Sequence, residues 1–283
     1  MKTKRVGIDR HQNAGIGTYC MLIAFSLFIL FPFAWMLVTS LKTLPDTFSV
    51  PPRWIPRPVS LQAFINIWSN YPLFYYFRNS FIIVFFSTFI CIVVSCLAGY
   101  AASRTDSKLK DPFLTFLLVL QMFPAVMLLV PYYKMLTTFG MINTLQGLVL
   151  PNIAFTMPFC TWMLMGYFNT IPRELEQSAS IDGCNKLQCF IKIILPLAIP
   201  GIAATCIYSF IQVWNEYMFS LTLQTSEQMK TLTVGIGQMI GESRIMWNEM
   251  MAANLLASLP LIIAFMFFQK YFISTLTAGA VKG

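Results

Sequence analysis

Few residues in this chain could do acid–base, nucleophilic or metal chemistry. Its 283 residues include one histidine, His11, and 11 aspartates and glutamates. No GxxxxGK[ST] phosphate loop or HExxH zinc motif occurs, and "VGIGQMIGE" lacks the glycine spacing of a dinucleotide-binding turn. The seven cysteines include no CxxC pair and mostly lie in apolar runs, where a thiol behaves as a small hydrophobe. We therefore predict no catalytic residue, no metal site and no bound cofactor, and a chain that cannot hydrolyse ATP alone.

Polar residues inside apolar segments are better candidates for a functional site. They are Gln121, Gln212, Asn215 and Glu216. An ionisable side chain in the middle of a membrane helix costs about 2.5–3.5 kcal/mol on insertion scales, so it indicates a substrate path or a paired group. Glu216 has two interpretations: a gate or structural contact, or a carboxylate solvated at the membrane surface. Nearby aromatic residues either stack on a sugar ring or form an aromatic belt at the membrane surface, namely Trp214, Tyr217 and Phe219.

A compact polar stretch, "ELEQSASIDGCNKLQCFIKIILPLAIPGI", begins at Glu174. Pro172 and the glutamates after it favour the first turn of a helix. Gly183 is expected to end that helix, and Asn185 to cap a second helix that leads into the next apolar segment. One face of the first helix carries mostly small side chains: Leu175, Ser178, Ala179 and Asp182. This face predicts a docking surface, or else an ordinary connection between two helices.

The elements that hold these residues are membrane-spanning helices. Hydrophobic residues make up 57% of the chain and charged residues 11%, against roughly 25% charged in a soluble domain. A span needs about 20 predominantly apolar residues. Six segments qualify, so we predict an all-α, polytopic membrane protein with spans at 17–41, 81–102, 113–133, 147–168, 197–221 and 252–273. The third and fourth contain prolines, which predicts kinked helices packed inside the bundle.

The charge distribution predicts the orientation. The first apolar run is too long for a signal peptide and is expected to stay in the mature protein. If the N-terminus lies inside, most lysines and arginines fall in the inner connections, so both termini and the stretch from Glu174 are predicted to face the cytoplasm. The net charge of +8 is scattered between apolar runs, which argues against a nucleic-acid partner.

The first outer connection, residues 42–80, is rich in proline and aromatic residues. Within it, "SLQAFINIWSN" has the spacing of an amphipathic helix at the membrane interface. The sequence leaves two roles open for this connection, a covering loop or a docking surface.

Several motifs together resemble a known family. The pattern of "PRELEQSASIDGC" followed by "LPLAIPGI" looks like the EAA loop of the transmembrane subunits of bacterial ATP-binding-cassette (ABC) importers. The resemblance extends over nearly the whole chain through "FRNSFIIV", "GMINTLQGLVLP", "WNEYMFSLTL" and "LTAGAVKG". The last two are similar to the carbohydrate-uptake class, in particular to the smaller permease of the maltose importer.

The resemblance implies one transmembrane permease domain over 1–283 with the type I ABC importer fold, in the bacterial cell membrane. It implies a second permease subunit, two ATPase subunits that bind ATP and magnesium, and an extracytoplasmic binding protein that delivers a sugar. Coupling to the ATPase would use the loop 169–196 through Glu176, Gln177, Ser178, Ala179, Asp182 and Gly183. The cytoplasmic tail 274–283 would contact the ATPase through Ala278, Gly279, Lys282 and Gly283. Gln177 departs from the family, since it stands where the motif has glutamate and cannot form an ion pair.

Other classes of function stay open at this point. An ABC permease for a non-carbohydrate solute would share the same motifs. An ion-coupled carrier would show internal repeats and paired intramembrane charges, and a membrane enzyme would show metal ligands or a nucleophile with its base. The chain shows none of these in evidence.

Overall fold

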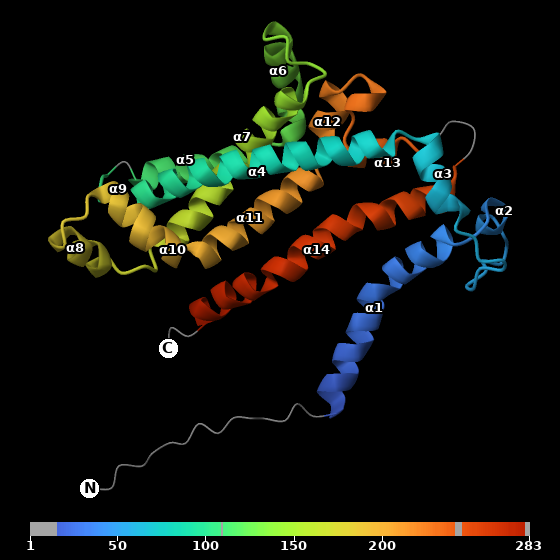
Figure 1. Ribbon diagram of the computed structural model, residues 1–283, viewed down its shortest axis with the longest axis horizontal. Helices are drawn as coiled ribbons and strands as arrows, with labels where there is room; N and C mark the ends of the chain where they lie inside the picture. The colour runs from blue at the N-terminus through green and yellow to red at the C-terminus, as the bar shows by residue number, and fades with distance from the viewer. Residues whose placement is uncertain (1–15, 109, 241–244, 281–283) are drawn as a thin grey trace.

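The long apolar segments of the sequence form helices, as predicted. A computed structural model describes residues 16–108, 110–240 and 245–280, with residues 111 and 270–280 described by their backbone alone. The described part contains no β-strand, only an isolated bridge between Ile240 and Ile245. The helices are α1 (Ile16–Ser40), α2 (Leu44–Thr47), α3 (Gln62–Asn70), α4 (Leu73–Arg104), α5 (Lys110–Gln121), α6 (Ala125–Thr138), α7 (Leu145–Phe168), α8 (Glu174–Ile181), α9 (Lys186–Cys189), α10 (Leu195–Leu197), α11 (Ile199–Trp214), α12 (Met218–Leu223), α13 (Leu232–Gly237) and α14 (Trp247–Ala280) (Figure 1).

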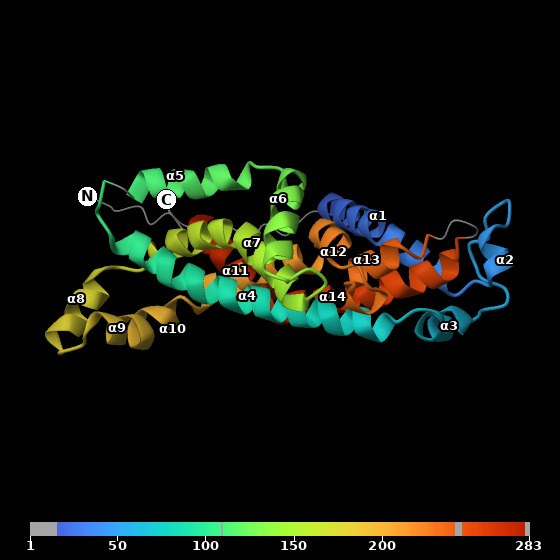
Figure 2. The same ribbon diagram turned by 90° about the horizontal axis from the view of Figure 1, so that it is seen from above.

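Four described helices, α1, α4, α7 and α14, are long and apolar enough to cross a membrane. Two further spans result if each of two bent helix pairs is one crossing. In Figures 1 and 2, α4, α7 and α11 form the body of the bundle, with α8 to α10 at one end and α2 and α3 at the other. The far end of α14 points toward the same end as α8 (Figure 1). The six crossings and their orientation in the membrane stay predictions.

The centre of the bundle is the contact between α4 and α7. Small polar side chains cross this contact: Thr161 Oγ1 donates to Ser95 Oγ at 3.2 Å, and Ser95 Oγ donates to the Met157 carbonyl at 3.3 Å. Such residues allow membrane helices to approach closely. At Gly99 the two helices approach closely, because an added Cβ would lie 2.9 Å from the Met165 backbone nitrogen. Only glycine fits at this position without moving one of the two helices.

Gly99→Val is therefore expected to destabilise the chain by about 1–3 kcal/mol, the usual cost of overpacking. The obstruction is backbone, which cannot rotate away as a side chain would. The measurement is the thermal unfolding midpoint of the purified protein in lipid nanodiscs. Gly166→Val on α7 is the matched control, because nothing lies within 4 Å of an added Cβ there. Equal midpoints for the two variants would contradict the close-packing argument.

The predicted third span, 113–133, was expected to be kinked, and the structure divides it into two helices. They are α5 and α6, bent by 93° around residues 122–124. Pro124 is the cause, because a proline disfavours helical geometry in the residue before it and offers no N–H to the preceding turn. The expectation that this segment packs inside the bundle fails, since Leu117 and Leu136 are the only buried residues described in the two helices. By contrast, α7 contains Pro151 and Pro158 in one continuous, well-buried helix.

The predicted fifth span, 197–221, also differs in the structure. The second helix of the polar stretch does not run straight into α11, because the chain bends by 74° at Ala198. Pro200 in the first turn of α11 removes the hydrogen bond that would have joined the two helices. A π-helical turn at Phe190–Ile194 precedes the bend, and α11 ends at Trp214 before the short α12 begins.

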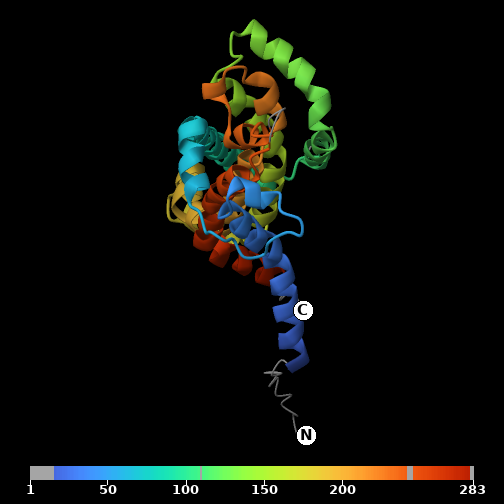
Figure 3. The same cartoon turned by 90° about the vertical axis from the view of Figure 1, so that its right-hand side faces the viewer.

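The outer connection packs against the bundle. The predicted amphipathic helix corresponds to α3, which buries Ala63 and Ile67 completely or nearly so and contacts α14 and α4. This arrangement favours the covering role over a free docking surface. Helix α1 contacts α14, and Figure 3 shows its N-terminal end extending beyond the bundle. Its side chains are exposed along most of the helix.

The predicted tail, 274–283, begins inside a helix. The backbone of α14 continues to Ala280, so Ala278 and Gly279 lie within the helix. Lys282 and Gly283 lie outside the described residues.

Candidate functional site

The polar stretch folds locally as its sequence predicts. Gly183 ends α8 in the left-handed region, with φ of +87°, and the Cys184 N–H donates to the Ala179 carbonyl at 2.9 Å. This is the glycine-terminated helix end expected there. Asn185 caps α9 through a capping box with Gln188, each side chain accepting from the other residue's backbone N–H at 2.9 Å. The elbow between α8 and α9 is therefore fixed by local hydrogen bonds.

One side of α8 is held against the bundle by three residues that we call the α8 clamp: Tyr100, Arg104 and Glu176. The Glu176 carboxylate accepts from Tyr100 Oη at 2.9 Å and from Arg104 Nε at 2.5 Å. Arg104 also donates to the carbonyls of Phe168 and Ile171, at 3.0 and 3.2 Å, where α7 has just ended. The clamp thus joins α8 to the ends of α4 and α7. Sequence reasoning missed Arg104, and it placed Glu176 on the docking side.

The opposite side of α8 is free. Gln177, Ser178, Asp182 and Gly183 are exposed, whereas Ala179 is only 4% exposed and does not contribute to the surface. Sequence reasoning also missed two exposed apolar residues: Ile181 of α8 is 87% exposed and Leu187 of α9 is 63% exposed. The available signal for Ile181 was an isoleucine at the end of a helix with few large apolar residues. Exposed large apolar side chains beside polar ones are typical of a surface that a partner covers.

A second ion pair, between Arg173 and Asp106, lies at the start of α8 on the protein surface. Arg173 donates to both carboxylate oxygens of Asp106 at 3.0 Å and to the Ser103 carbonyl at 3.3 Å. The hydrogen bonds and positive charge of Arg173 hold the pKa of Asp106 below its usual value. Both side chains are exposed, so solvent screens their attraction and the pair contributes little to stability.

The four polar candidates from the spans are not brought into one cluster. Gln121, at the end of α5, donates to the Phe155 carbonyl of α7 at 2.6 Å. On α11, Gln212 donates to Tyr208 Oη at 3.0 Å. Tyr208, Gln212 and Asn215 are spaced i, i+4 and i+7, so they form one stripe along α11. The stripe also meets α7, because the rings of Phe159 and Tyr208 have centroids 4.5 Å apart.

Glu216 has a structural role. Its carboxylate accepts the backbone N–H groups of Phe219 at 2.6 Å and Ser220 at 3.0 Å, which are unpaired donors in the first turn of α12. Its own carbonyl accepts from Thr233 Oγ1 at 2.6 Å. Of the two interpretations of Glu216, the structure therefore favours the structural contact over solvation at the membrane surface.

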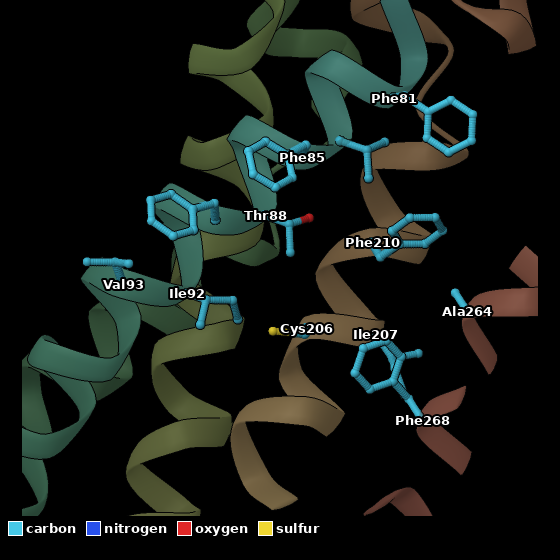
Figure 4. A pocket seen from close by; sticks show the side chains of 12 residues that line it. Phe81, Phe85, Thr88, Ile92, Val93, Cys206, Ile207, Phe210, Ala264 and Phe268 are labelled. Atoms are coloured by element: carbon cyan, nitrogen blue, oxygen red, sulfur yellow. The ribbon is translucent and has the colours of Figure 1, made fainter. Parts of the chain in front are cut away.

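Cavities of different composition lie beside α11. One of about 500 Å³ between α4, α11 and α14 is lined almost entirely by apolar side chains such as Phe85 and Phe210, with Thr88 as the hydroxyl residue (Figure 4). It offers little to recognise a polar solute. Another, of about 430 Å³, lies between α11, α13 and α14 and has a mixed lining that includes Asn215. In the described part of the chain, no three His, Cys, Asp or Glu side chains lie close enough to hold a metal ion.

The chain as a whole is similar to known transport proteins. The family described as "Binding-protein-dependent transport system inner membrane component" matches residues 15–277. The sulfoquinovosyl glycerol transport system permease protein of Agrobacterium fabrum is 35% identical over 90% of this chain and 89% of that protein. The trehalose/maltose transport system permease protein of Thermococcus litoralis is 36% identical over 92% of this chain and 94% of that protein. In fold, the chain is similar to one from a crystal structure of a bacterial ABC transporter that imports the acidic polysaccharide alginate, with a TM-score of 0.79 at 21% identity over 91% of this chain and 96% of that one.

Proposed function

The chain belongs to the family of binding-protein-dependent transport system inner membrane components, and we propose that it forms half of the translocation path of an ABC importer for a sugar or oligosaccharide. Its relatives that transport sulfoquinovosyl glycerol and trehalose or maltose support a carbohydrate substrate. As a transport subunit it catalyses no reaction itself, and a separate subunit hydrolyses ATP.

The observation that carries the transport role is the stripe on α11. Gln212 of α11 and Asn215, which follows this helix, are exposed, and Tyr208 is half-buried and contacts Phe159 of α7. Polar groups facing hydrocarbon lack hydrogen-bond partners, so exposed amides on a membrane-spanning helix are expected to face water or protein. We place the stripe, together with Gln121, on the wall of a path shared with a second permease subunit. Glu216 supports that wall by holding α12.

Coupling to ATP hydrolysis is proposed for the free side of α8. Gln177, Ser178, Asp182 and Gly183, with the apolar Ile181, would dock on the cytoplasmic ATPase, which binds ATP and Mg²⁺. Movement of α8 would then reach α4 and α7 through the clamp and alternate the path between inward-open and outward-open states. Shifting such an equilibrium from 1:99 to 99:1 takes about 5.5 kcal/mol of differential interaction.

The remaining partners follow from the same proposal. Two ATPase subunits, a second permease and an extracytoplasmic binding protein would complete the importer in the bacterial cell membrane. Both termini of this chain would face the cytoplasm, and the end of α14 with the residues after it would contact the ATPase pair through Ala278, Gly279, Lys282 and Gly283.

The test is reconstitution in liposomes of this chain with the second permease, ATPase and binding protein encoded beside its gene. We expect ATP-dependent uptake of at least one of maltose, trehalose, melibiose and raffinose, and no uptake when any component is left out. Uptake by this chain alone, driven by a proton or sodium gradient, would show an ion-coupled carrier instead. Uptake of only non-carbohydrate solutes would contradict the substrate class and leave the importer role standing.

A further inference from the structure

The mixed cavity between α11, α13 and α14 has the composition of a carbohydrate site. It has a volume of about 430 Å³, within the range of small-molecule pockets. Its described lining includes no Asp, Glu, Lys or Arg, and it combines two aromatic residues with amide and hydroxyl side chains: Trp214, Tyr217, Asn215, Thr233, Asn254 and Ser258. A neutral solute with many hydroxyl groups fits such a lining better than an ion.

Asn215, Asn254 and Ser258 orient their side chains so that their oxygen atoms can accept hydrogen bonds. Asn215 Nδ2 donates to the Ile211 carbonyl and Asn254 Nδ2 to the Met250 carbonyl, each at 2.9 Å, which fixes the orientation of both amides. Ser258 Oγ donates to the Leu255 carbonyl at 2.7 Å. Within the described residues, neither Asn Oδ1 receives a hydrogen bond. These oxygens can therefore accept from the hydroxyl groups of a ligand.

One wall of the cavity is an aromatic ring held in place. Tyr217 lies against Gly237 of α13, where an added Cβ would come within 3.0 Å of the tyrosine ring. The Tyr217 side chain is still 36% exposed. Trp214 is only 4% exposed, stacks on Phe210 and donates its Nε1–H to the Ala257 carbonyl at 3.2 Å, so it forms a rigid floor. Aromatic groups with an apolar face and a polar edge suit a sugar ring, which has both.

The cavity continues the stripe that lines the proposed path. Asn215 belongs to both, since it follows Tyr208 and Gln212 on one face of α11 and lines the cavity at the end of that helix. Asn254 and Ser258, spaced i, i+4, contribute the facing side from α14. A solute bound in the cavity would thus contact Asn215, the residue that the cavity and the stripe share.

From this arrangement we infer that the cavity binds one ring of a neutral oligosaccharide at the entrance of the path. The inference rests on the proposed sugar-import function. It assigns Asn254, Ser258 and Tyr217 as substrate contacts.

The test uses the importer reconstituted with saturating, sugar-loaded binding protein, where the binding protein no longer limits uptake. Asn254→Leu, Ser258→Ala and Tyr217→Leu are each expected to lower the uptake rate of the best-transported of the four neutral sugars about 3- to 10-fold, as loss of one contact would. Stimulation of ATP hydrolysis by the binding protein should stay at the wild-type level, because the docking surfaces are untouched. Thr222→Val is the matched control, since its hydroxyl also bonds its own helix, at 2.8 Å to Met218, but does not line the cavity.

Wild-type uptake rates in all three cavity variants would overturn the inference while leaving the proposed function intact. Loss of ATPase stimulation together with uptake would also overturn it, because that result indicates a structural role. If the wild-type importer takes up none of the neutral sugars, the proposed function fails and the inference fails with it. Ser258→Ala removes a single oxygen, so it decides the question even if Asn254→Leu does not assemble.

Discussion

Replacing Gly183 with valine is expected to abolish uptake and the stimulation of ATP hydrolysis by the binding protein while leaving membrane insertion intact. Gly183 has φ of +87°, a conformation that costs a residue with a side chain about 1–3 kcal/mol and a β-branched residue most. Nothing lies within 4 Å of an added Cβ, so the effect comes from the backbone and not from a clash. The chain is expected to relieve the strain by reorienting the elbow, which moves α8 away from the surface that it presents to the ATPase.

The measurement compares ATPase stimulation and uptake in liposomes, with the amount of inserted protein determined separately. Gly140→Val is the matched control, because Gly140 also has a positive φ, of +64°, and open space around it, but follows α6 far from α8. Gly183→Asn should retain most activity, since asparagine tolerates the left-handed region. Normal coupling in Gly183→Val, or equal loss in both valine variants, would contradict a specific role for the elbow.

Features that depend on neighbouring residues were predictable from the sequence. The apolar helices follow from hydropathy, and the ends of α8 and α9 follow from the special backbone of Gly183 and the side-chain oxygen of Asn185. The structural role of Glu216 could have been predicted for the same reason. Its partners Phe219 and Ser220 are three and four residues away, at the start of a helix. The choice between its two interpretations needed only the position where α12 begins.

Features that depend on distant contacts were not predictable. The prolines of α7 sit in one helix because its neighbours enclose it, whereas Pro124 breaks the chain into α5 and α6, which have little packed around them. In the sequence, Arg104 counted only as one of the basic residues that predict the orientation of the chain in the membrane. Its partner Glu176 is 72 residues away, and no local pattern connects the two. The mixed cavity likewise combines residues of α11, α13 and α14 that share no motif.

Breaking the α8 clamp is expected to cost both stability and coupling. Glu176→Gln removes the charge that Arg104 faces in a site where the two side chains are 19% and 14% exposed. Hydrogen bonds to charged groups contribute about 1.5–3 kcal/mol each, and partial exposure places the expected loss near the lower end. Arg104→Ala should cost more, because it also leaves the carbonyls of Phe168 and Ile171 without their donors. The thermal unfolding midpoint in nanodiscs should therefore be lower for Glu176→Gln than for the wild type, and lowest for Arg104→Ala.

The ratio of sugar transported to ATP hydrolysed distinguishes a clamp that transmits movement from a contact that only stabilises the fold. If α8 moves α4 and α7 through Arg104, then Glu176→Gln should lower the number of sugar molecules transported per ATP hydrolysed even at temperatures where the variant is fully folded. Asp106→Asn is the matched control, because it also neutralises a carboxylate paired with an arginine beside α8, but on the exposed pair. That variant should keep the wild-type ratio and midpoint. An unchanged ratio in Glu176→Gln would mean that α8 is coupled to the bundle by the chain connection at residues 169–173 and not by the clamp.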